Sequence, residues 1–237
     1  MNDPYINITE NVKHVLDEIS AAADLCGRDP SEITLVAASK MNPAETVRLS
    51  AAAGISVFGE NRVQEMLEKN ALGAYAGCDL HFIGHLQKNK VKNVVGLASL
   101  IHGIDSLSLL ETVSRIAESK NMIQDVLLEI NIGAEETKSG FSPSEISDIL
   151  DSAQALKGIK VRGLMAIPPI CEKPEENHPF FARMQQLFID IGAKKYDNSS
   201  MDFLSMGMSR DYTEAIKCGS NMVRVGTAIF GPRNYSK

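Results

Sequence analysis

The stretch Ile33-Thr34-Leu35-Val36-Ala37-Ala38-Ser39-Lys40 is a short apolar run that ends in a lysine, and Met41-Asn42-Pro43 follows it. A run of this length bounded by turn residues is typical of a buried strand, and Pro43 suits the first turn of a helix. Side chains alternate along a strand, so Lys40 shares a face with Val36 and Ala38. Lys40 therefore projects from the C-terminal tip, either as a lysine that leaves the core for water or as a partly desolvated nucleophile.

The composition is that of an ordinary globular protein with room for a large core. The chain has 237 residues, 44% of them hydrophobic and 23% charged, and its formal net charge is −6. The acidic balance argues against a nucleic-acid partner, which a basic patch would support. The chain starts with polar residues and has no apolar run of membrane-spanning length, so we expect neither a signal peptide nor a membrane anchor. The four cysteines have no paired spacing, which favours a cytoplasmic protein without a zinc site.

Eight short apolar runs alternate with helical patterns after an amphipathic helix expected over residues 5–26. The expected strands are residues 33–40, 55–58, 80–84, 99–104, 126–132, 161–167, 203–206 and 222–225. The expected intervening helices are residues 43–53, 62–72, 87–95, 106–119, 142–156, 180–191 and 211–217. This alternation predicts a parallel sheet covered by helices, and eight units suit an α/β fold of the closed (β/α)8 TIM barrel type, one domain over residues 1–237. The alternative is an open doubly wound sheet, although no Gly-x-Gly-x-x-Gly follows the first strand.

The last two expected strands end in turns that suit a phosphate group. Function in a barrel of this kind resides at the C-terminal ends of the strands, where Gly207 and Gly226 occur beside hydroxyl side chains. Such turns bind phosphate through backbone N–H groups and a helix N-terminus, and Ser205, Ser209 and Thr227 would add hydroxyl donors. The alternative is turn chemistry alone, because Ser209 is also a good N-cap.

Arg224 faces away from Val223 and Val225 in a buried strand, where an arginine is rarely left unpaired. It serves either a structural ion pair or a ligand at the barrel mouth. A lysine, a phosphate cup and an arginine at one barrel mouth together indicate pyridoxal 5′-phosphate (PLP): the lysine forms an imine with the aldehyde, the cup holds the phosphate and the arginine meets the ring nitrogen.

From about residue 33 to its end, the chain resembles the pyridoxal-phosphate homeostasis protein family, an alanine-racemase-like family of single-domain barrels. The motifs that carry the resemblance are Ala38-Ser39-Lys40, Phe58-Gly59-Glu60-Asn61-Arg62-Val63-Gln64-Glu65, His81-Phe82-Ile83-Gly84-His85-Leu86-Gln87-Lys88-Asn89-Lys90, Lys138-Ser139-Gly140-Phe141, Arg162-Gly163-Leu164-Met165-Ala166-Ile167, Leu204-Ser205-Met206-Gly207-Met208-Ser209 and Val223-Arg224-Val225-Gly226-Thr227-Ala228-Ile229-Phe230-Gly231. Arg62 is a departure, because family members commonly have tyrosine there.

The resemblance implies a fold-type-III barrel, with an extra N-terminal helix, that holds PLP as an internal aldimine on Lys40. It implies phosphate contacts from Ser205, Gly226 and Thr227, together with Met206 and Ser209. It places Arg224 at the pyridine nitrogen, and Asn61 and Met165 along the ring.

Four other polar residues near the strand tips have plainer interpretations. We expect Glu60 to pair with a neighbouring lysine or arginine, and His81 and His85 to be structural or loop contacts. Lys138 either lies on the surface or closes over the site. The N-terminal helix either plugs the barrel bottom or packs on its side.

The function expected from the resemblance is a carrier and buffer of PLP in intracellular PLP homeostasis, without robust catalytic turnover. Racemases of this fold use a tyrosine base from a second domain, which we do not find in the sequence. The expected partners are PLP and PLP-dependent apoenzymes as recipients, and we expect a monomer. Two alternatives are a low-activity PLP-dependent amino-acid racemase and a barrel that binds another phosphorylated metabolite.

Overall fold

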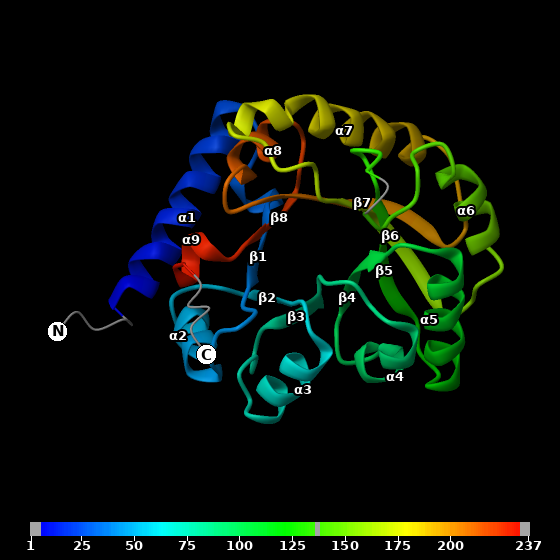
Figure 1. Cartoon of the computed structure of the whole chain (residues 1–237), viewed down its shortest axis with the longest axis horizontal. Helices are drawn as coiled ribbons and strands as arrows, with labels where there is room; N and C mark the ends of the chain where they lie inside the picture. The colour runs from blue at the N-terminus through cyan, green and yellow to red at the C-terminus, as the bar shows by residue number, and fades with distance from the viewer. Residues whose placement is uncertain (1–5, 136–137, 233–237) are drawn as a thin grey trace.

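The computed structural model describes residues 6–135 and 138–232, and its centre is a closed barrel of eight parallel strands (Figure 1). Each strand pairs with the next, and the last pairs with the first through Leu35 and Val223, among other residues. This closure confirms the (β/α)8 barrel and excludes the open sheet. The strands are β1 (Thr34–Ala38), β2 (Val57–Glu60), β3 (Asp79–Phe82), β4 (Leu100–Ile104), β5 (Gln124–Ile130), β6 (Ile159–Ala166), β7 (Ser199–Met208) and β8 (Met222–Val225).

Helices follow the strands in sequence and cover the outside of the barrel, as Figure 1 shows. They are α2 (Ala44–Ala52), α3 (Val63–Ala71), α4 (Val91–Val94), α5 (Leu107–Ser119), α6 (Ile146–Ala153), α7 (His178–Gly192), α8 (Tyr212–Lys217) and α9 (Thr227–Phe230). The described residues also form three short 3₁₀ helices: η1 (Pro30–Glu32), η2 (Lys88–Lys90) and η3 (Pro174–Asn177). The helix expected over residues 87–95 is therefore divided into η2 and α4, while the other expected helices form with shifted ends.

The strands separate two apolar layers, as their alternation requires. Val36 and Met165 belong to a cluster inside the barrel. Leu35, Ala37 and Phe58 belong to the larger cluster between the strands and the helices. The face that Val36 shares with Ala38 and Lys40 is therefore the inner face of β1. Lys40, two residues beyond β1 on the same face, lies at the mouth of the barrel.

The N-terminal helix α1 (Ile6–Leu25) packs on the side of the barrel against α2, α8 and α9 (Figure 1). Its buried face includes Val12, Val15 and Ile19. The Asn11 side chain donates to the carbonyl oxygen of Ile229 at 2.9 Å. Of the two positions considered for this helix, the lateral one is therefore correct. Within the described ranges, no helix combines the length and the apolar character needed to cross a membrane.

Candidate functional site

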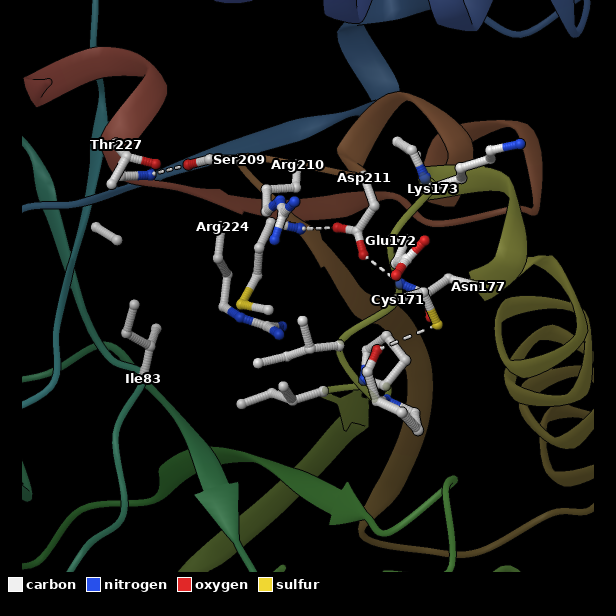
Figure 2. Close-up of a pocket in the computed structure, with 18 of the residues that line it drawn as sticks. Ile83, Cys171, Glu172, Lys173, Asn177, Ser209, Arg210, Asp211, Arg224 and Thr227 are labelled. Atoms are coloured by element: carbon white, nitrogen blue, oxygen red, sulfur yellow. Dashed lines mark hydrogen bonds between the residues drawn. The ribbon is translucent and has the colours of Figure 1, made fainter. Parts of the chain in front are cut away.

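A pocket of about 450 Å³ opens at the C-terminal ends of the strands (Figure 2). This is the size range of small-molecule sites. Six of the nine site residues expected from the sequence line it, and they come from β8 and from the turns after β1, β2, β7 and β8. These six residues are Lys40, Asn61, Ser209, Arg224, Gly226 and Thr227. Residues more than 180 positions apart are thus brought together by the closure of the barrel.

Lys40 and Asn61 enter the pocket from the turns after β1 and β2. Lys40 is half-buried, and its carbonyl oxygen accepts from the Asn42 amide at 3.1 Å. The Asn61 Oδ1 atom is buried and has no hydrogen-bond partner among the described residues. Because a buried acceptor without a partner is costly, Oδ1 fits a site whose ligand supplies the missing donor. Gly84 packs so closely on Asn61 that a Cβ at Gly84 would lie 2.3 Å from the Asn61 carbonyl oxygen.

Arg224 reaches into the pocket from β8 and is 4% exposed (Figure 2). Its Nη1 donates to the Ser205 carbonyl at 2.9 Å and to the Ser205 Oγ at 2.5 Å. Its Nη2 donates to the Ala166 carbonyl at 3.0 Å. These three bonds leave two of the five guanidinium N–H groups for a ligand. Burial lowers the pKa of Arg224 to about 10, against the opposing effect of Glu129, so the guanidinium stays charged at neutral pH.

A chain of buried polar groups continues behind Arg224. The Ser205 Oγ lies 3.1 Å from His102 Nδ1, and His102 Nε2 lies 3.0 Å from His81 Nδ1. Burial lowers the pKa of His81 to about 4. Burial, followed by the charges of His81 and Arg224, lowers the pKa of His102 well below its usual value. Both imidazoles are therefore neutral at pH 7, and the chain holds the guanidinium in place.

Ser205 thus sits behind Arg224 and does not line the pocket. The expected contact of Ser205 with a phosphate stays a prediction. His81 is structural, as expected. His102 was overlooked in the sequence, where its one indication was a polar side chain inside the apolar run 99–104.

The loops after β7 and β8 bring hydroxyl and amide groups together at one end of the pocket. The Ser209 Oγ accepts from the backbone N–H of Gly226 at 3.0 Å and of Ala228 at 3.4 Å. Ser209 is therefore not the N-cap of α8, a position that Asp211 occupies. Two N–H groups converge on one oxygen at the pocket wall, an arrangement that also suits an oxygen of a bound anion.

Met165 and Met206 lie away from the pocket wall. Met165 is 1% exposed inside the barrel. The Met206 side chain lies outside the barrel, in the apolar layer between the strands and the helices. The Met206 backbone carbonyl accepts from the Ser220 hydroxyl at 2.8 Å. The expected contacts of Met165 with a ring and of Met206 with a phosphate stay predictions.

The segment 167–177, which we name the strap, forms the wall opposite the barrel strands (Figure 2). The Asn177 Nδ2 donates to Asp211 Oδ2 at 2.8 Å, and the Cys171 thiol donates to Asn177 Oδ1 at 3.1 Å. Lys138 Nζ donates to the Pro168 carbonyl of the strap at 3.3 Å. The sequence does not indicate the position of the strap, because the segment leads into α7, which packs against α8.

Comparisons with known proteins agree with this geometry. The family model described as "Alanine racemase, N-terminal domain" matches residues 13–234. The pyridoxal phosphate homeostasis protein of Aquifex aeolicus is 40% identical over 230 residues, which are 97% of this chain and 100% of the relative. The Escherichia coli (strain K12) protein of the same name is 40% identical, and the alignment covers 100% of each chain.

Solved structures show the same barrel. PipY of Synechococcus elongatus, solved with PLP bound, has a TM-score of 0.78 and 32% identity over 90% of this chain and 100% of PipY. Alanine racemase of Clostridium difficile 630 has a TM-score of 0.71 at 16% identity, over 96% of this chain and 58% of the racemase, a likeness of fold alone. The chain therefore belongs to the pyridoxal phosphate homeostasis protein family, which is built on the barrel of the alanine racemase N-terminal domain.

Proposed function

We propose that this protein binds PLP in the pocket at the barrel mouth, with Lys40 as its covalent tether. The observation that carries the proposal is the set of groups around one pocket of about 450 Å³: an amine, a buried guanidinium, an amide oxygen without a partner and converging N–H donors. The PLP-bound structure of PipY supports it, because that relative is 32% identical over nearly the whole chain.

Each part of the cofactor has a complementary group in the pocket. Ser209, Gly226 and Thr227 would hold the phosphate, Arg224 would face the ring nitrogen, and Asn61 would lie along the ring. Lys40 would bind through its amine, which condenses with the aldehyde and releases water. When bound, PLP supplies an electron-withdrawing ring to any amine attached to its aldehyde carbon.

The role that fits these residues is PLP homeostasis, as a carrier or buffer without robust turnover. Arg224 carries a positive charge at neutral pH, so a proton on a ring nitrogen beside it would meet a like charge. An unprotonated ring withdraws electrons weakly. The described residues that line the pocket include no tyrosine and no histidine that would act as a base. The names of the curated relatives, homeostasis proteins, are consistent with this role.

PLP-dependent apoenzymes are the recipients that a carrier of this kind would serve, and the monomer is the state that we propose. A cytoplasmic location is supported by the four cysteines, which are all free thiols in the structure.

Absorption spectra test the proposal directly. Addition of PLP to the wild-type protein should produce an imine band, which Lys40→Ala should lose. Borohydride reduction followed by peptide mapping should place the modification on Lys40. Absence of the band from the wild type would refute PLP tethering. Racemisation of alanine or serine at ordinary enzyme rates, lost with Lys40→Ala, would replace the carrier role by that of a racemase.

A further inference from the structure

Lys40 lies in a tight turn that the surrounding structure must impose. The Asn42 N–H donates to the Ser39 carbonyl at 3.1 Å across this turn, and Met41 within it has a φ of 64°. This left-handed conformation is uncommon for a residue with a large side chain. It persists where neighbouring groups over-determine the backbone, and such residues cluster at functional sites.

Helix α3 supplies two side chains that hold the turn on both sides of Lys40. The Lys69 Nζ donates to the Ser39 carbonyl at 2.8 Å and so fixes the peptide group before Lys40. The Glu65 Oε2 accepts from the Met41 N–H at 2.8 Å and fixes the peptide group after it. Lys69 Nζ lies 3.2 Å from Glu65 Oε2, which joins the two contacts into one unit.

Glu60 at the end of β2 anchors this unit to the barrel. Its Oε1 accepts from Lys69 Nζ at 2.7 Å, from Ser39 Oγ at 2.6 Å and from the Tyr75 hydroxyl at 2.9 Å. This confirms the expected pairing of Glu60 with a neighbouring lysine. Glu60 is 0% exposed and Lys69 is 6% exposed.

The bonds to Ser39, Glu60 and Glu65 use all three N–H groups of the Lys69 ammonium. A buried ammonium with every donor satisfied has one favourable position.

We propose that Lys69 and Glu65 are positioning residues, which fix the backbone of Lys40 so that its amine enters the pocket in the orientation needed to bond PLP. This inference rests on the proposed function. Neither residue is among those that line the pocket, so both act through the backbone of the turn.

The step that they favour is a condensation. The lone pair of the amine nitrogen forms a bond to the aldehyde carbon, and the aldehyde oxygen leaves as water with the two hydrogens of the amine. An amine that is already oriented bonds more readily than one that must first be ordered.

Binding of two ligands, PLP and pyridoxine 5′-phosphate, distinguishes a loss of Lys40 positioning from a general disruption of the pocket. Pyridoxine 5′-phosphate has the ring and the phosphate of PLP but a hydroxymethyl group in place of the aldehyde, so it cannot bond to Lys40. Glu65→Ala removes the acceptor for the Met41 N–H, and the Glu65 side chain is 20% exposed, so the fold should tolerate its loss. Glu68→Ala is the matched control, because Glu68 is an exposed glutamate on the same helix.

We expect Glu65→Ala to weaken PLP binding about tenfold, the factor that one hydrogen bond to a charged group contributes. Binding of pyridoxine 5′-phosphate should stay unchanged. Glu65→Gln should retain most of the PLP affinity, because its amide oxygen still accepts from the Met41 N–H. Glu68→Ala should behave as the wild type with both ligands.

The outcomes distinguish this inference from the function on which it rests. Suppose that the wild type binds PLP more tightly than pyridoxine 5′-phosphate. If Glu65→Ala then lowers the affinity for both ligands equally, or for neither, the positioning role is wrong and the proposed PLP site stands. If the wild type binds both ligands equally and shows no imine band, the proposed function fails, and the positioning role fails with it.

Discussion

Acidification should destabilise the barrel through the buried pair of His81 and His102. Burial lowers the pKa of His81 to about 4 and that of His102 well below its usual value in the folded protein. In the unfolded chain both would titrate near the ordinary histidine value of about 6.5. Between these pH values the unfolded state binds more protons than the folded state. The free energy of unfolding therefore falls as the pH falls from about 6.5 towards 4.

The size of the effect follows from the two pKa values of His81. At pH 5, the protonated form of a histidine with a pKa of about 6.5 exceeds the neutral form about thirtyfold. For a histidine with a pKa of about 4, the neutral form exceeds the protonated form about tenfold. The difference in proton binding between pH 7.5 and pH 5 is worth about 2 kcal/mol. His102 should change the stability in the same direction, because burial lowers its folded-state pKa as well. The loss expected from His81 alone is thus a sizeable part of a typical total stability of about 5–15 kcal/mol.

Urea unfolding followed by far-ultraviolet circular dichroism at pH 7.5, 6 and 5 would measure this dependence. His102→Gln retains a hydrogen-bonding side chain without a titrating group, so its stability should depend less on pH than that of the wild type. His14→Gln is the control, because the His14 side chain is 72% exposed. Carboxylates titrate equally in all three proteins, including Glu129, whose pKa burial raises. Identical pH slopes for the wild type and His102→Gln would refute the reasoning.

Four further substitutions test other parts of the structure. Gly163→Ala should destabilise the protein by about 3 kcal/mol or more in denaturant unfolding, because its Cβ would lie 1.9 Å from a β7 carbonyl oxygen. Gly27→Ala should lower the free energy of unfolding by only about 1 kcal/mol, because Gly27 has a φ of +66° but open space where the added Cβ would lie. Equal losses of stability in the Gly163 and Gly27 variants would contradict this account of both sites. Ser209→Ala should weaken PLP binding about tenfold or more in a spectroscopic titration, because a hydrogen bond to a charged phosphate contributes about 1.5–3 kcal/mol, whereas an unchanged affinity would remove Ser209 from the phosphate site. Asn177→Ala should release the strap from α8 and speed thiol labelling of Cys171 by several-fold, as followed by peptide mapping; an unaltered rate would show that the strap is held by other contacts.

The barrel could be predicted from the sequence because its indications are local and repeat eight times. Each apolar run ends in a turn and precedes a helical pattern, and Val36 and Leu35 reveal the two faces of β1 by alternation alone. The limits of β7 could not be predicted in the same way. This strand begins at Ser199, four residues before the apolar run, because polar and partly exposed residues pair with β6 outside the core.

The arrangement of the site was only partly accessible from sequence. Lys40 and Gly226 lie at strand tips, and strand tips can be found from local patterns. The contact between Ser205 and His102 joins residues 103 positions apart. The contact between Ser205 and Arg224 depends on the register with which β7 and β8 pair, which is irregular between Ser205 and Met208. A one-residue difference in such a register exchanges the two faces of a strand, so the role of Ser205 required the closed barrel.

The position of α1 has a consequence for how the protein folds during synthesis. The hydrogen bond from Asn11 to Ile229 joins residues 218 positions apart, and ribosomes add about 5–20 residues per second. The apolar face of α1 therefore remains without its partners α8 and α9 for roughly ten to forty seconds after the helix has been made. The seam between β8 and β1 stays open over the same interval, because β8 is the last of the described strands to be synthesised. Barrel closure and burial of α1 are thus late, coupled events, and until then the nascent chain exposes a hydrophobic surface that chaperones can recognise.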